Sequence, residues 1–180
     1  MNRSETTLPN LGDVDGLCRA TMSTPVGELT LIASPRGLRA VLWPDELADP
    51  DRVASAADGD PAAVGILRDA AQQLEEYFRG DRHDFDLPLD PVGTAFQESA
   101  WMELRRIPYG QTISYGEQAR RLGDSNKSRA VGAANGRNPI SIIVPCHRVV
   151  GANGSLTGFA AGVDAKAWLL RHEQGSLTLL

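Results

Sequence analysis

The sequence predicts an α+β fold, in which a small three-stranded antiparallel sheet with one helix precedes a mainly helical C-terminal half that contains a helix-turn-helix. Two patterns lead to this prediction. Residues 19–43 alternate apolar and polar side chains between turn signals, which is typical of a meander of strands. After residue 94, apolar side chains recur at three- and four-residue steps, and polar caps divide them into short helices.

The first 90 residues supply the strands and one long helix. Turn signals at 25–27 and 34–37 divide the alternating segment into three strands. Residues 44–60 are rich in Asp, Ala and Pro and are expected to form a loop or an irregular crossing. A helix with a core-facing apolar stripe is predicted over 61–78, with Gly80 as its stop signal.

Short elements fill the C-terminal half. Thr94 is expected to cap a first helix, TAFQESAWMELRRI, and Ser114 a second, YGEQARRLG. The third helix follows a short break and reads KSRAVGAANGRN, so the second and third resemble a helix-turn-helix. A strand over 140–144, a Gly-rich segment over 151–162 and a final helix over 163–173 complete the prediction.

Composition predicts the domain organisation and the compartment. Residues 1–16 are polar, lack the apolar region of a secretory signal and are expected to be a disordered lead-in. The extended stretch HDFDLPLDPVG indicates a boundary between an N-terminal α/β scaffold domain, 17–90, and a C-terminal domain, 91–180. No apolar run is long enough to span a bilayer. Cys18 and Cys146 are expected to be free thiols in the cytoplasm, and no residue cluster suggests a zinc site.

Charge is distributed unevenly along the chain. Residues 1–91 hold 8 basic and 17 acidic residues, a net charge of −9, whereas residues 92–180 hold 10 and 6, a net charge of +4. The stretch 104–148 alone has a net charge of +6. Such a chain can present a basic face to a polyanion. A solvated helix surface is the alternative, and charge alone leaves both open.

The third predicted helix is composed of unusually small residues. Its central long side chain, Arg129, stands among residues that let a helix approach a neighbour closely: Ser128, Ala130, Gly132, Ala133 and Ala134. Tight packing on another helix would explain this composition. Close approach to nucleic acid would explain it as well, with Arg129 as the kind of wedge that accompanies minor-groove binding or an extruded base.

A thiol meets two basic side chains at Cys146-His147-Arg148. Pro145 cannot donate a ladder hydrogen bond, so Cys146 is expected to emerge where the preceding strand ends. His147 and Arg148 are residue types that favour a thiolate, and Glu173 is a candidate to orient the histidine. Neighbours on a strand point to opposite faces, so Cys146 and His147 can cooperate only if the chain turns, or through a water. A packed cysteine, a hydrolase, an acyl transferase and an alkyl acceptor all stay open.

Three segments carry a resemblance to a known family. The segment NPISIIVPCHRVVGANGSLTGFAAGVDAKAWLLRHE resembles the active-site region of O6-alkylguanine-DNA alkyltransferases. TAFQESAWMELRRIPYGQTISYGEQARRLG and SRAVGAANGRNP resemble that family's helix-turn-helix. The resemblance is close over 92–175, and PVGELTLIAS matches the family's opening hairpin in outline. It implies a ribonuclease H-like scaffold over 17–90.

The resemblance implies a stoichiometric DNA-repair protein, a methylated-DNA–[protein]-cysteine S-methyltransferase. Such a protein binds the minor groove, flips the damaged base into a pocket and moves its alkyl group irreversibly onto its own cysteine. The implied partner is double-stranded DNA that contains O6-alkylguanine, and O4-alkylthymine as a further substrate. No cofactor, metal, membrane or obligate protein partner is implied, and the chain is expected to be a monomer.

The resemblance also implies residue roles. Cys146 would be the alkyl acceptor, and His147, supported by Glu173, would deprotonate it by way of a water. Asn138 would be a hinge between the recognition helix and the active-site segment. Tyr115 would crowd a phosphate and donate a proton to the departing guanine. Residues expected at the DNA are Arg129, which would fill the gap left by the flipped base, and Tyr115, Ser128, Ala130, Gly132, Asn135 and Thr94.

The base pocket is expected to include Val149, Phe159 and Ala160, with backbone carbonyls of Cys146 and Val149 reading the exocyclic amine. Phe159 stands where the family usually has Tyr, and the small residues that follow it are bulkier than the usual pattern, which is expected to narrow the pocket or stiffen its loop. Three alternative functions are an alkyltransferase-like lesion-binding protein without transfer activity, a major-groove transcriptional regulator and a cysteine hydrolase.

Overall fold

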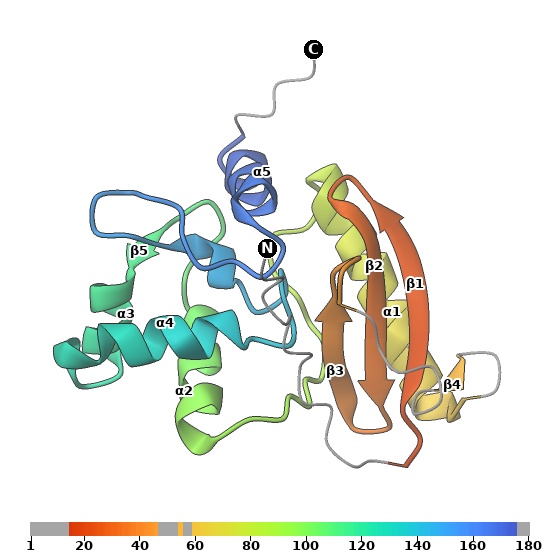
Figure 1. Ribbon diagram of the computed structural model, residues 1–180. Helices are drawn as coiled ribbons and strands as arrows, with labels where there is room; N and C mark the ends of the chain where they lie inside the picture. Colours follow the sequence, from red (N-terminus) through yellow and green to blue (C-terminus); the bar gives the residue numbers. More distant parts are fainter. Residues whose placement is uncertain (1–14, 47–53, 56–58, 176–180) are drawn as a thin grey trace, which may run out of the picture.

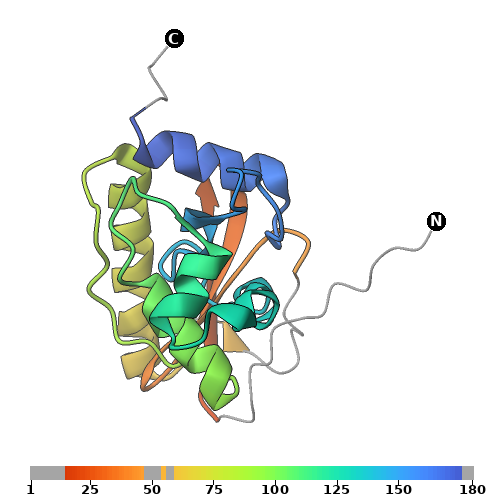
Figure 2. The ribbon, with the colours of Figure 1, turned by 90° about the vertical axis from the view of Figure 1, so that its left-hand side faces the viewer.

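The structure, a computed structural model, describes residues 15–46, 54–55 and 59–175. They form two parts that lie side by side, a sheet with one long helix against it and a group of short helices (Figure 1). The final helix lies at one end of the molecule and is seen along its length in Figure 2. The predicted order of a small sheet followed by helices is confirmed.

The N-terminal sheet contains the predicted meander. Strands β1 (Cys18–Thr24), β2 (Gly27–Ser34) and β3 (Gly37–Leu42) pair antiparallel in sequence order. A fourth strand, β4 (Ala54–Ser55), pairs parallel with β1 inside the segment expected to be a loop. Two residues are too few to leave a periodic pattern, so the sequence did not indicate this strand.

The long helix α1 (Pro61–Arg79) packs against the sheet (Figure 1). Asp60 caps its first turn by accepting from the backbone amides of Ala62 and Ala63. Gly80 ends it in the left-handed conformation at φ 84°, which a residue without Cβ adopts without strain. Its buried residues recur at three- and four-residue steps, as the sequence predicted: Ala63, Leu67, Ala70, Leu74 and Tyr77.

Short helices form the second part. They are α2 (Ala95–Leu104), α3 (Tyr115–Arg121), the 3₁₀ turn η2 (Ser125–Lys127) and α4 (Ser128–Gly136). Thr94 caps α2 in a capping box with Gln97, and Ser114 caps α3 by accepting from the Glu117 amide. Both predicted caps are therefore confirmed, and they set where the two helices begin.

The segment 140–144, predicted as a strand, is a buried turn instead. Ile140 forms a single parallel bridge with Val41, and the chain then folds back so that the Val144 amide donates to the Ile140 carbonyl at 2.9 Å. Ile142 has a positive φ of 74°, which is rare for a β-branched residue and incompatible with a strand. The apolar composition correctly indicated that this segment is buried, but the prediction of a strand was wrong.

The last elements follow this turn. A 3₁₀ turn, η3 (Cys146–Arg148), leads into β6 (Val149–Val150), which pairs parallel with β5 (Ile113–Ser114). The Gly-rich segment has no regular structure, and α5 (Val163–Glu173) has the predicted bounds. Along the described chain, no helix has the length and apolar character needed to cross a membrane.

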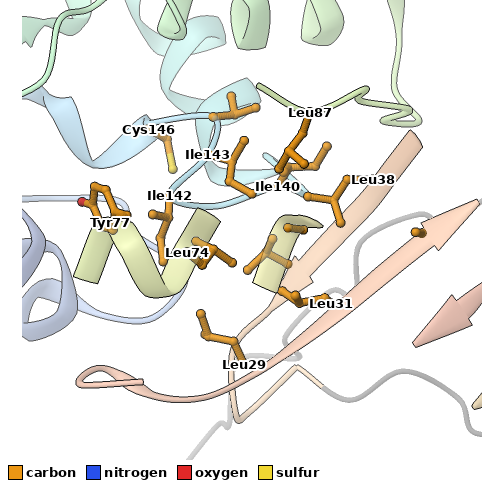
Figure 3. Packing of buried hydrophobic residues seen from close by; sticks show 14 of the residues in the cluster. Leu29, Leu31, Leu38, Leu74, Tyr77, Leu87, Ile140, Ile142, Ile143 and Cys146 are labelled. Carbon is orange, nitrogen blue, oxygen red and sulfur yellow. The ribbon is translucent and has the colours of Figure 1, made fainter. Parts of the chain in front are cut away.

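One hydrophobic cluster joins the two parts. Figure 3 shows residues of the sheet and of α1 against the turn that precedes Cys146. The cluster includes Leu29, Leu31, Leu38, Leu74, Ile140, Ile142, Ile143 and Cys146. The domain boundary near residue 90 stays a prediction. The lead-in predicted over 1–16 lies almost wholly outside the described residues.

Candidate active site around Cys146

Cys146 begins η3 and is almost completely buried, with 7% of its surface exposed. Asn138 holds the turn before it, because its side-chain amide donates to the Val144 carbonyl at 2.8 Å and its oxygen accepts from the Ile140 amide at 3.0 Å. Burial raises the pKa of the Cys146 thiol, and a hydrogen bond from Asn138 and the charge of Lys166 act in the opposite direction. The thiol therefore favours its protonated form, and a nucleophilic role would require a base.

His147 lies beside the thiol in sequence and pairs with Glu173. Its Nε2 lies 2.7 Å from Glu173 Oε1, and both side chains are fully buried. Burial lowers the pKa of His147, while the hydrogen bond and charge of Glu173 raise it, and the net direction is downward. The imidazole is thus held neutral. Its other nitrogen, Nδ1, has no hydrogen-bond partner among the described residues, so it can accept a proton.

Glu173 is the most heavily hydrogen-bonded side chain of the site. Arg148 donates from Nε to Oε2 at 2.8 Å and from Nη2 to Oε1 at 2.9 Å. The Gly110 amide donates to Oε2 at 3.2 Å, and the Tyr77 hydroxyl to Oε1 at 2.8 Å. Burial would raise the pKa of Glu173, but the hydrogen bonds from His147 and Arg148 and the charge of Arg148 prevail and hold that pKa below its usual range.

Arg148 is bonded to the carboxylate of Glu173 and to the backbone, which agrees with a structural or electrostatic role. Its guanidinium is committed to Glu173 and to the Ile107 carbonyl, which accepts from Nη1 at 2.6 Å. Arg148 therefore neutralises the Glu173 carboxylate, and it is not among the groups that shift the pKa of Cys146. Its support of the site is electrostatic and acts on Glu173.

A second polar group lies over the Gly-rich segment. Tyr115, the first residue of α3, donates its hydroxyl to the Thr157 carbonyl at 3.0 Å. Lys166 on α5 is buried, and its ammonium donates to the same carbonyl at 2.9 Å and to the Tyr115 hydroxyl at 3.5 Å. Burial lowers the pKa of Lys166, and the charge of Cys146 opposes that shift. Sequence reasoning missed Lys166.

One signal could have found Lys166. It stands three, four and seven residues before Leu169, Leu170 and Glu173, on the face of α5 that is buried. A lysine at a core-facing position needs a partner inside the protein. Tyr77 left no comparable signal, because an apolar stripe explains its place on α1.

The Gly-rich segment and α4 line an open hollow. Its lining includes Gly132 and Gly136 of α4 and the segment from Leu156 to Val163, with Phe159 and Ala160 among them. Phe159 packs against Trp43 with ring centroids 5.5 Å apart in an edge-to-face arrangement. Of the predicted pocket residues, Phe159 and Ala160 therefore line this hollow, while Val149 is fully buried and is not among its lining residues.

The exposed face of α4 carries most of the residues predicted to meet DNA. Arg129 and Ala130 are exposed, and Ser128 and Gly132 are half-buried. Thr94 is exposed at the start of α2. Asn135 is placed differently from the prediction: only 5% of its surface is exposed, and it exchanges two hydrogen bonds with Gln118 on α3. Its side chain joins the two helices and is not available at a surface.

The chain matches two models of known protein families. Residues 17–91 match the family model described as the ribonuclease-like domain of 6-O-methylguanine DNA methyltransferase, and residues 95–175 match the model of its DNA binding domain. The chain belongs to the 6-O-methylguanine DNA methyltransferase family. The resemblance found in the sequence is thereby confirmed.

Relatives within the 6-O-methylguanine DNA methyltransferase family span nearly the same length. A methylated-DNA–protein-cysteine methyltransferase of Methanosarcina acetivorans is 46% identical over 154 residues, which cover 86% of this chain and 96% of the relative. One from Shigella flexneri is 45% identical over 166 residues, covering 87% and 95%.

Solved structures confirm the fold class. The crystal structure of Mycobacterium tuberculosis O6-methylguanine methyltransferase has a TM-score of 0.78 and 41% identity, covering 91% of this chain and 96% of that one. Mycobacterium tuberculosis OGT in complex with DNA has a TM-score of 0.78 and 42% identity, covering 88% and 93%.

Among the described residues, no group of His, Cys, Asp and Glu side chains is arranged to hold a metal ion.

Proposed function

We propose that this protein repairs double-stranded DNA by moving the alkyl group of O6-alkylguanine, and of O4-alkylthymine, onto Cys146, once per molecule. Family membership supports DNA repair by alkyl transfer, and the relatives named above are methylated-DNA–protein-cysteine methyltransferases. The observation that carries the proposal is the buried His147–Glu173 hydrogen bond, whose histidine directly follows the buried Cys146 in the chain. A base held neutral, with one free ring nitrogen, is what such a thiol needs.

The reaction is a displacement at the alkyl carbon. His147 takes the Cys146 proton at Nδ1, by way of a water, and the imidazolium is stabilised by Glu173. The thiolate sulfur then bonds to the alkyl carbon while the bond from that carbon to O6 breaks, and the electron pair leaves with the guanine. Tyr115 donates the proton that neutralises the guanine, and the Lys166 ammonium beside its hydroxyl stabilises the phenolate. A thioether is a stable product, so the protein turns over once.

DNA is the partner, and α4 is the face proposed to meet its minor groove. Small residues on the exposed side of α4 allow close approach to the duplex, and Arg129 is the long side chain positioned to fill the space of an extruded base. The damaged base would enter the hollow between α4 and the Gly-rich segment, against Phe159 and Ala160. Asn138 would tie that helix to the turn that holds Cys146.

The test is a single-turnover reaction with a duplex that contains O6-methylguanine. One methyl group should appear on the peptide that contains Cys146, in an amount equal to the protein. Cys146→Ser should abolish transfer and still bind the duplex, because the hydroxyl is a much weaker nucleophile of similar size. Cys18→Ser is the matched control, a second buried cysteine in β1, and should transfer normally.

Other outcomes would identify the alternatives. Binding of the lesion with no methyl gain would indicate a lesion-binding protein without transfer activity, and repeated turnover would indicate an ordinary enzyme. A monomeric state and a cytoplasmic location remain part of the proposal.

A further inference from the structure

Tyr77 links the N-terminal part to the site, although 96 residues separate it from Glu173. It lies on α1, is completely buried and donates its hydroxyl to Glu173 Oε1 at 2.8 Å. The same oxygen lies 2.7 Å from His147 Nε2 and accepts from Arg148 Nη2. The proposed function assigns no role to this hydroxyl.

We propose that Tyr77 is a positioning residue, through which the N-terminal part sets the orientation of Glu173 and the proton affinity of His147. This inference rests on the proposed function, because it concerns the base of that reaction. The shared oxygen is the central observation. Each donor to Oε1 withdraws some of its negative charge, and that charge is what stabilises the protonated form of His147.

The Tyr77 hydroxyl is a permanent donor. Burial raises the pKa of Tyr77 far above its ordinary value, and the charge and hydrogen bond of Glu173 raise it further. The phenol therefore stays protonated over the whole range in which the imidazole titrates. A donor that never titrates gives Glu173 a constant environment while His147 gains and loses its proton.

The ring of Tyr77 is held in place from several sides. Aromatic neighbours surround it, with ring centroids 5.1 to 6.1 Å away: Phe78, Phe85, Tyr109 and His172. The backbone carbonyl of Tyr77 also lies 2.7 Å from His172 Nε2, which attaches α1 to α5 at this point. A fixed ring with a fixed hydroxyl can hold the Glu173 carboxylate against rotation.

The other charged and titratable groups around the pair define the sign of the effect. Those that face the His147–Glu173 pair are Lys166 from α5, Arg148 from η3, Tyr77 from α1 and Tyr109 from the turn after α2. Arg148 and Lys166 lower the pKa of His147, and Glu173 raises it. Removing the Tyr77 hydroxyl leaves more charge on Glu173, so the pKa of His147 should rise.

The experiment compares Tyr77→Phe with Tyr109→Phe in the full-length chain. Both remove one phenolic hydroxyl from the same aromatic cluster, but the structure gives the Tyr109 hydroxyl no hydrogen bond within the described residues. The readout is the single-turnover transfer rate from an O6-methylguanine duplex as a function of pH, with DNA affinity and thermal unfolding measured beside it.

For Tyr77→Phe we expect the acidic limb of the pH profile to move to higher pH. The transfer rate should fall roughly 3- to 10-fold at about pH 6 and by less at about pH 8, since a single hydrogen bond contributes on this scale and this one acts on His147 through Glu173. DNA affinity should not change. Tyr109→Phe should keep the wild-type profile.

A second variant gives the opposite sign and does not depend on the folding of the first. A fluorinated tyrosine at position 77 keeps the hydroxyl and makes it a stronger donor, so the acidic limb should move to lower pH. Unshifted profiles for both variants, or a loss that is equal at every pH and follows the loss of folded protein, would overturn the inference. If the wild-type chain transfers no methyl group, the proposed function fails, and this inference fails with it.

Discussion

Glu173 shows how one buried side chain can organise a site. Its carboxylate is enclosed, yet the donors around it, with the Arg148 guanidinium, hold its pKa below the ordinary range. Isolated buried charge is costly, and removing one member of a buried pair leaves the other uncompensated. Glu173→Gln should therefore lower the free energy of unfolding by about 3–5 kcal/mol, measured by urea denaturation at neutral pH.

The matched control for this substitution is Glu117→Gln on α3. Glu117 also accepts from two arginines, Arg120 and Arg121, but these pairs lie at the surface, where water screens them. Stability should change little. An equal loss in both variants would contradict the view that burial makes the Glu173 network important.

The loss of stability caused by Glu173→Gln should depend on pH in a defined direction. A carboxyl whose pKa is lower in the folded state stabilises the fold above its unfolded pKa, and this contribution is lost as pH falls toward the folded value. The stability difference between the wild type and Glu173→Gln should be complete above about pH 5 and should shrink on acidification, since an unfolded glutamate titrates near that range. A difference that grows on acidification would show that the carboxyl is not ionised in the fold.

At this scale the sequence indicated candidate residues, but few of their contacts. Residue types and spacing led to Cys146, His147 and Glu173, and the structure brings His147 and Glu173 together. Tyr77 was predicted only as a core residue, because nothing local distinguishes a tyrosine that fills a core from one that also donates to a carboxylate. Asn135 was misplaced for the same reason, since its partner Gln118 is on another helix.

Among the elements, α4 allows the most specific prediction about DNA binding. In the described part of the chain, Arg129 on this helix and Arg137 just after it form no ion pair, whereas Arg120 and Arg121 pair with Glu117. The charges of Arg129 and Arg137 are thus available to DNA phosphates. Their loss should not affect folding, because both side chains are exposed.

Arg129→Ala and Arg137→Ala should weaken binding to a duplex and reduce its salt dependence. Each phosphate contact releases counterions, so removing one should lower the slope of log affinity against log salt by about one. Arg129→Ala should also slow methyl transfer from a duplex more than transfer from a single strand, because only the duplex requires base flipping. Arg68→Ala, an exposed arginine on α1, is the control and should leave both properties unchanged.

Elements also show where pattern reading fails. The caps at Thr94 and Ser114 and the bounds of α5 are local in origin, and they were predicted correctly. The turn over 140–144 is not local. Besides the hydrogen bonds of the Asn138 side chain, it depends on one bridge to Val41 and on the positive φ of Ile142, which the surrounding core helps to maintain.

At the scale of the whole molecule, the contact region between the sheet with α1 and the group of short helices, here called the seam, is packed like a protein core. The Val41 amide donates to the Pro139 carbonyl at 2.9 Å, and Ile140 beside it is fully buried in the cluster that both parts share. Tyr77 and Glu173 cross the same seam. The acidic N-terminal half therefore contributes to the structure around the site, because it supplies part of the core to which Cys146 belongs.

A shared core predicts that the described parts unfold together. Ile140→Ala at the seam should cost about 2–5 kcal/mol, as large-to-small core changes do. Ile32→Ala lies in a separate cluster, which the period of two along β2 places on the opposite face of the sheet. Hydrogen exchange followed by mass spectrometry should show faster exchange in both β2 and α4 for either variant. If Ile32→Ala speeds exchange only in the strands, the sheet and the group of short helices unfold independently. Tyr77 could then hold the Glu173 carboxylate in place only in molecules in which both parts are folded at the same time.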